Sequence, residues 1–134
     1  MKRELALQAS RFDTSRPTGQ VNWGGGTPTF LSRDEMTELM ASTREHFTLR
    51  PDDEGEYSIE IDPREADART IVELRTLGFN RLSLGVQDFD SLVQHAINRI
   101  QPLGMTAEIM RAARATGYHS VSVDLIYGLP YQTV

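Results

Sequence analysis

Side chains that could bind a ligand fall at the ends of predicted strands. In several short stretches polar and apolar residues alternate, as in a half-buried strand. Such stretches end at or near Glu60, Gln87 and Asp124, and the loop 24–27 follows the first of them. The carboxyl ends of strands are where α/β folds bind their ligands. Taken singly, each polar residue is better explained as a strand-end cap or a helix partner than as a ligand contact. Their agreement in position and in strand phase favours a ligand site at this edge of the sheet.

The first run leads into Val21-Asn22-Trp23-Gly24-Gly25-Gly26-Thr27-Pro28-Thr29. Glycine lets backbone approach a ligand closely and reaches positive φ at little cost, while proline stiffens the exit of the loop. A glycine triplet alone is also an ordinary loop that ends a strand. A dinucleotide fingerprint would need a third glycine at Thr29, and the Gly-Lys-Ser/Thr of a P-loop is absent. The loop alone is therefore weak evidence for a ligand site, and the elements around it must supply the rest.

Hydrophobic periodicity predicts helices alternating with strands. We expect strands at 20–24, 57–62, 81–87 and 120–127, and helices at 2–12, 32–46, 67–77, 90–99 and 106–116. Ser32 to Glu35 matches a capping box, and Gly78 is placed just past a helix end. Strands separated by helices imply parallel pairing and an α/β fold.

All four predicted strands have one polar or small face. The residues of this face are Gln20, Asn22 and Gly24; Ser58, Glu60 and Asp62; Arg81, Ser83, Gly85 and Gln87; and Ser120, Ser122 and Asp124. Parallel strands covered on both faces read as nearly continuous apolar runs. The alternation predicts a partial (β/α) barrel, with helices on the outer face and a ligand cavity inside. A sheet with a merely solvated face is the alternative.

Composition limits the possible functions. The chain has 134 residues, about one domain (1–134), and falls short of the ~250 residues of a complete eight-fold barrel. The net charge of −5 disfavours nucleic acid as a partner. There is no apolar run of membrane-spanning length and no signal peptide, so we expect a cytoplasmic location. The chain has no cysteine, and its three histidines lack metal-ligand spacing, so no metal site is expected.

Five ordered motifs carry a family resemblance. They are the glycine loop 23–29, Ser58-Ile59-Glu60-Ile61-Asp62-Pro63-Arg64-Glu65, the stretch from Gly78 to Phe89 with Gly85-Val86-Gln87-Asp88-Phe89, Asn98-Arg99, and Asp124-Leu125-Ile126-Tyr127-Gly128-Leu129-Pro130. With them the chain resembles the radical S-adenosylmethionine (SAM) enzymes, specifically the oxygen-independent coproporphyrinogen III oxidase family. Within the second and third motifs, the sequences Asp-Pro-Arg-Glu and Gln-Asp-Phe favour this family over the related heme chaperones.

The resemblance implies a role for each candidate residue. Gly25, Gly26 and Thr27 would approach the methionyl end of SAM. Arg99 would pair with the carboxylate of SAM, and Glu60 would lie near its amino group. A guanidinium matches a carboxylate in bidentate geometry, so the charges agree with these roles.

The resemblance likewise implies that Gln87 and Asp124 bond the ribose hydroxyls. In this family, reductive cleavage of SAM yields a 5′-deoxyadenosyl radical, which removes a hydrogen from a propionate of coproporphyrinogen III. Decarboxylation to vinyl groups at two positions gives protoporphyrinogen IX, a step of heme and porphyrin biosynthesis. An electron donor is implied as a further partner.

One departure from the family pattern is clear. The family binds a 4Fe-4S cluster through a Cys-x3-Cys-x2-Cys loop, and this chain has no cysteine. We expect a fragment without the cluster loop and the C-terminal part, inactive alone, which self-associates through open sheet edges. Two alternatives remain open: a fragment of a heme chaperone, and a cluster-free α/β module that binds another nucleotide-like ligand.

Overall fold

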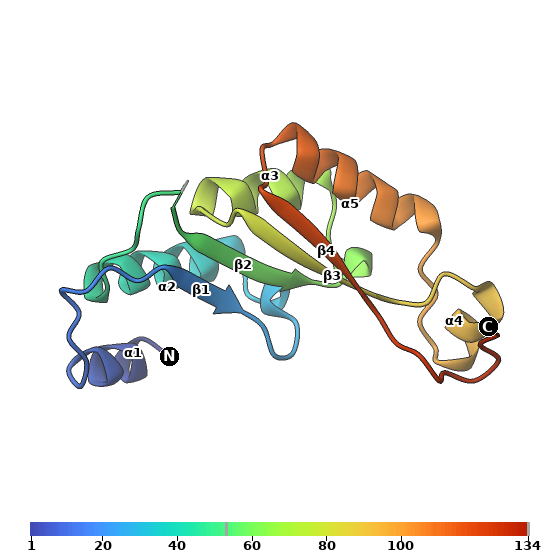
Figure 1. The fold of residues 1–134 in the computed structure, drawn as a ribbon, viewed down its shortest axis with the longest axis horizontal. Helices are drawn as coiled ribbons and strands as arrows, with labels where there is room; N and C mark the ends of the chain where they lie inside the picture. Colours follow the sequence, from blue (N-terminus) through green and yellow to red (C-terminus); the bar gives the residue numbers. More distant parts are fainter. Residues whose placement is uncertain (53, 134) are drawn as a thin grey trace.

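A computed structural model describes residues 1–52 and 54–133, so Val134, the last residue of the expected domain, lies outside the described residues. Helical segments connect each strand to the next along the chain (Figure 1). In order the elements are α1 (Lys2–Ala9), β1 (Gln20–Trp23), the 3₁₀ helix η1 (Pro28–Phe30), α2 (Arg33–His46), β2 (Glu56–Ile61), the 3₁₀ helix η2 (Pro63–Glu65), α3 (Ala68–Leu77), β3 (Arg81–Gln87), α4 (Ser91–Ala96), α5 (Leu103–Ala115) and β4 (Ser120–Leu125).

The strands form one four-stranded sheet in the order β1-β2-β3-β4, and every neighbouring pair is parallel. Each strand therefore lies beside the next strand in the sequence. This arrangement confirms the predicted α/β fold with parallel strands. It also brings the carboxyl ends of all four strands to the same edge of the sheet.

The core lies between one face of the sheet and three helices. The inward residues of β2 and β3 alternate with more exposed ones, as the sequence predicts. They pack with side chains of α2, α3 and α5 in a cluster that includes Met36, Met40, Tyr57, Ile59, Ile61, Ile71, Leu74, Phe79, Leu82, Leu84, Val86, Ile109 and Ala113. Because these helices all cover one face of the sheet, the polar residues of the strands lie on the opposite face.

Side-chain caps fix the helices that cover the sheet. Ser32 and Glu35 form the predicted capping box at the start of α2. Asp67 caps α3, and Gly78 ends that helix at φ 105°, a conformation that favours glycine. These caps satisfy backbone groups that a helix end would otherwise leave without partners.

Three helices differ from the sequence prediction by more than one residue at one end. The helix expected at 2–12 ends at Ala9, where the Ser10 hydroxyl bonds to Leu7 O at 2.7 Å, and Phe12 is 66% exposed beyond it. The helix expected at 90–99 is shorter because the backbone turns to φ 52° at Asn98. The helix expected at 106–116 instead begins three residues earlier, after Pro102.

Strand ends shift by no more than two residues: the runs expected at 20–24, 57–62 and 120–127 appear as β1, β2 and β4, while β3 matches 81–87. No helix in the described part of the chain is long and apolar enough to cross a membrane.

Candidate functional site

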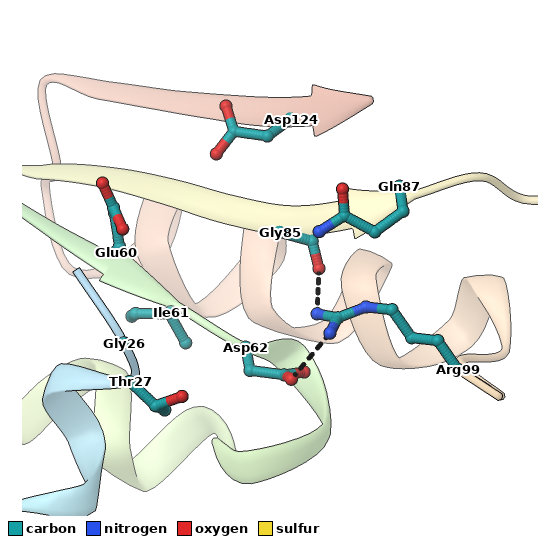
Figure 2. A pocket seen from close by; sticks show the side chains of 9 residues that line it. All are labelled: Gly26, Thr27, Glu60, Ile61, Asp62, Gly85, Gln87, Arg99 and Asp124. Atoms are coloured by element: carbon teal, nitrogen blue, oxygen red, sulfur yellow. Dashed lines mark hydrogen bonds and ion pairs between the residues drawn. The ribbon is translucent and has the colours of Figure 1, made fainter. Parts of the chain in front are cut away.

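A cavity of about 200 Å³ opens at the carboxyl edge of the sheet (Figure 2). Its lining comes from the glycine loop, the ends of β2, β3 and β4, and the segment after α4. The lining residues are Gly26, Thr27, Glu60, Ile61, Asp62, Gly85, Gln87, Arg99 and Asp124. Six of the seven candidate residues from the sequence are among them. The seventh, Gly25, is adjacent to the cavity through its bond to Glu60.

The glycine loop and Glu60 are fitted to each other. The Gly25 backbone N–H donates to Glu60 Oε2 at 3.3 Å. A Cβ at Gly24 would collide with the Glu60 carboxylate, so only glycine leaves that carboxylate its present position. Gly25 and Gly26 have φ of 80° and 84°, values that other L-residues rarely adopt. The loop thus places backbone and one carboxylate side by side at the cavity wall.

The end of β3 departs from regular strand geometry at the cavity. Gln87 has φ 73°, and the register between β3 and β4 shifts between Gly85 and Gln87. Such irregularities cluster at binding sites, where they redirect a side chain. A Cβ at Gly85 would lie 3.3 Å from Gln87 Nε2 and 3.4 Å from Arg99 Nη2, so glycine gives both side chains room.

Arg99 reaches the cavity from a segment that is held rigidly. The buried Gln94 side chain bonds to the backbone of Asp88 and Gln101 at 2.9 Å, and the Arg99 N–H donates to Gln94 O at 2.8 Å. The guanidinium donates from Nη2 to Gly85 O at 2.7 Å. Its Nε is buried and has no hydrogen-bond partner among the described residues.

Asp62 is the ion-pair partner of Arg99. Asp62 Oδ2 lies 3.1 Å from Arg99 Nη1, and the same carboxylate accepts bonds from Arg64 Nε and Nη2 at 2.7 to 3.2 Å. Burial acts to raise the pKa of Asp62, but hydrogen bonds from Arg64 and the charge of Arg99 outweigh burial and hold this pKa below its usual value. The carboxyl group is therefore ionised at neutral pH.

Asp124 projects from the polar face of β4. Its Oδ2 accepts a 2.6 Å hydrogen bond from Ser83 Oγ on the neighbouring strand β3. Ser122 Oγ lies 3.2 Å from Ser83 Oγ and extends this polar row. The bond from Ser83 orients the Asp124 carboxylate and leaves Oδ1 available to accept from a ligand.

The cavity lining has an excess of negative charge. It contains one guanidinium and three carboxylates, those of Glu60, Asp62 and Asp124. Such a lining suits a ligand that is cationic overall, carries hydroxyl donors and offers one anionic group to Arg99. Within residues 1–52 and 54–133, no group of histidine and acidic side chains is arranged to hold a metal ion.

Three lining residues, Ile61, Asp62 and Gly85, were not among the candidates selected from the sequence. Asp62 and Gly85 belong to the polar faces of their predicted strands, and this alternation was the signal that would have found them. Ile61 belongs to the apolar face, which gave no such signal. The pairing of Asp62 with Arg99 joins residues on different elements, and periodicity carries no information about such a contact.

Comparisons with known proteins agree with this architecture. The model of the family described as the radical SAM superfamily matches residues 2–134. Oxygen-independent coproporphyrinogen III oxidase from Pseudomonas aeruginosa is 53% identical over 131 residues, and that from Synechocystis sp. is 46% identical over 132 residues. Each alignment covers 98% of this chain, and the chain spans 28% of the length of each relative.

Among solved structures, coproporphyrinogen III oxidase from Escherichia coli, described as a radical SAM enzyme, superposes with a TM-score of 0.91 at 43% identity. The superposition covers 98% of this chain and 30% of that protein.

Proposed function

The chain belongs to the radical SAM superfamily, and we propose that it is the SAM-binding part of an oxygen-independent coproporphyrinogen III oxidase. In this proposal residues 1–134 form one domain, a partial barrel that holds SAM in the cavity at the carboxyl edge of its sheet. The observation that carries the proposal is the single guanidinium set among three carboxylates in that cavity.

The charges of SAM match this lining. The ligand carries a sulfonium, an ammonium and a carboxylate, so it is cationic overall with one anionic group. In the proposed arrangement Arg99 binds the ligand carboxylate, and its buried Nε, which has no partner among the described residues, supports that role. Glu60 binds the ammonium group, and its bond from Gly25 N–H keeps the carboxylate at the loop.

The remaining groups of the cavity suit the ribose and the ligand's methionyl backbone. Asp124 accepts a hydrogen bond from a ribose hydroxyl, and the Gln87 side-chain amide can accept from or donate to the ribose hydroxyls. Gly25, Gly26 and Thr27 bring backbone against the methionyl end, where a larger residue at 25 or 26 would strain the loop. These residues bind and orient the ligand; its cleavage is cofactor chemistry.

SAM, when bound and reductively cleaved, supplies the hydrogen-abstracting chemistry of the superfamily. The chain contains no cysteine, so it provides no thiolate ligand for a 4Fe-4S cluster. Coproporphyrinogen III as substrate belongs to the proposal through the names of the relatives, which support the oxidase over the heme chaperone. A separate electron donor belongs to it only through the family resemblance.

Equilibrium dialysis with labelled SAM tests the cavity assignment. We expect the chain to bind SAM and Gln87→Ala to weaken binding by about fivefold, the scale of one net hydrogen bond. Gln20→Ala is the matched control, because Gln20 lies at the opposite end of the strands and bonds to Glu56. Equal affinity of wild type and Gln87→Ala would refute the assignment of Gln87.

A chimera tests the proposed activity. The 131 residues of the Pseudomonas aeruginosa oxidase that align with this chain are replaced by it, and anaerobic decarboxylation of coproporphyrinogen III is measured. We expect an active chimera. A chimera that folds and binds SAM but does not decarboxylate the porphyrinogen would contradict the proposed activity while leaving SAM binding intact.

A further inference from the structure

We propose that Asp62 is a positioning residue that fixes the Arg99 guanidinium for the carboxylate of the cavity ligand. The inference rests on the proposed function, because it takes SAM as that ligand. Neither the sequence motifs nor the comparisons assign a role to Asp62.

The Arg99 guanidinium is held at two points and free at others. A guanidinium has five N–H donors in a planar fork. Arg99 Nη1 forms an ion pair with Asp62 Oδ2 at 3.1 Å, and Nη2 donates a hydrogen bond to Gly85 O at 2.7 Å (Figure 2). These two contacts fix the plane of the guanidinium. Nε has no partner among the described residues, and each Nη keeps one further hydrogen. A carboxylate can therefore bind without displacing either existing partner.

Asp62 is itself rigid, which lets it act as an anchor. It follows β2 directly and caps η2, accepting the Arg64 backbone N–H at 3.0 Å. Its side chain is 13% exposed and that of Arg99 is 18% exposed, so the surrounding residues restrict the rotamers of both. An arginine side chain loses much rotamer freedom when it binds a ligand, and prior fixation removes part of that cost.

The pairing leaves positive charge available for the ligand. Asp62 is shared between Arg99 and Arg64, which grips the carboxylate through both Nε and Nη2. Two guanidinium groups on one carboxylate leave a net positive cluster. Asp62 therefore orients Arg99 without cancelling its attraction for an anionic group.

The test compares two ligands that differ only in the carboxylate. One is SAM, and the other is decarboxylated SAM, which retains the adenosine, sulfonium and ammonium groups. Dissociation constants are measured by calorimetry for wild type and Asp62→Asn. Asparagine keeps an oxygen that accepts the Arg64 N–H but loses the charge that holds Arg99. We expect Asp62→Asn to weaken SAM binding by about tenfold and to leave decarboxylated SAM within about twofold.

Two further variants separate positioning from general stability. Asp52→Asn removes a carboxylate that pairs with Arg75 at 2.7 Å at the opposite end of the sheet, and it should leave both dissociation constants unchanged. If Asp62→Asn fails to fold, Asp62→Glu, which keeps the charge but moves it by one methylene, should show the same selective weakening of SAM binding.

Each outcome of this comparison is decisive. Selective loss of SAM affinity supports the inference. Unchanged or tighter SAM binding, or equal losses for both ligands, overturns it while leaving the proposed function in place. Failure of wild type to bind either ligand overturns the proposed function, and the inference with it.

Discussion

Replacing Gly24 by alanine should damage the cavity through one side chain. Gly24 has no positive φ, so alanine is compatible with its backbone. A Cβ there would collide with the Glu60 carboxylate, which must then leave its place beside the loop. Displacement removes the 3.3 Å bond from Gly25 N–H and moves the carboxylate away from the proposed ammonium position.

The expected loss follows from these interactions. A hydrogen bond to a charged group contributes about 1.5–3 kcal/mol, and each 1.4 kcal/mol is a factor of ten in affinity. We therefore expect Gly24→Ala to weaken SAM binding by about tenfold or more. Stability of the fold should change little, because the displaced Glu60 side chain is exposed.

Calorimetric titration of SAM into Gly24→Ala, Glu60→Gln and the double variant measures this effect. Because both changes remove the same interaction, the double variant should bind about as weakly as either single variant. Gly104→Ala is the control, since a Cβ at Gly104 meets no atom within 4 Å. Full additivity of the two losses, or wild-type affinity in Gly24→Ala, would refute the reasoning.

Three further predictions concern the scaffold. Asn80→Ala should lower the free energy of unfolding by about 3 kcal/mol or more in urea denaturation, because the buried Asn80 side chain bonds to the backbone of Tyr57, Asp52 and Gly55 at 2.8 to 2.9 Å; a change below about 1 kcal/mol would contradict this. The hydrogen bond from the Arg75 guanidinium holds the pKa of Asp52 below its usual 3.8, so the ionised Asp52 stabilises the fold fully above that pH and loses this effect as the pH falls further. In acid melts, the stability of Asp52→Asn should therefore depend less steeply on pH than that of wild type below pH 4. A pH profile parallel to that of wild type would argue against this prediction. In the described residues β1 pairs only with β2 and β4 only with β3, so light scattering should detect self-association, which a monodisperse monomer would disprove.

Strand phase made most of the fold and much of the cavity predictable from sequence. Polar and apolar residues alternate in every strand, and the period of two assigns each side chain to a face. That rule alone places Glu60 and Asp124 on the face opposite the helices and near the carboxyl edge. The parallel order then follows from the helical connections.

Local caps and long-range contacts account for what sequence reasoning missed. The first helix stops at Ala9 because Ser10 bonds back to the preceding turn, a choice that the apolar stripe does not encode. The role proposed for Arg99 came from the family resemblance, since a lone arginine after a helix has no periodic signal. Its pairing with Asp62 depends on how α4 and the following segment pack against the sheet, and so appears only in three dimensions.

The central claim is that the cavity of this chain binds SAM. Calorimetric titration of SAM into wild type and into Asp124→Ala tests it most directly, because Asp124 lies on β4 and is oriented by Ser83 at 2.6 Å. We predict measurable binding by wild type and a loss of more than about 1 kcal/mol, roughly fivefold in affinity, in the variant. Absence of binding by wild type, or equal affinity of the two proteins, would contradict the claim.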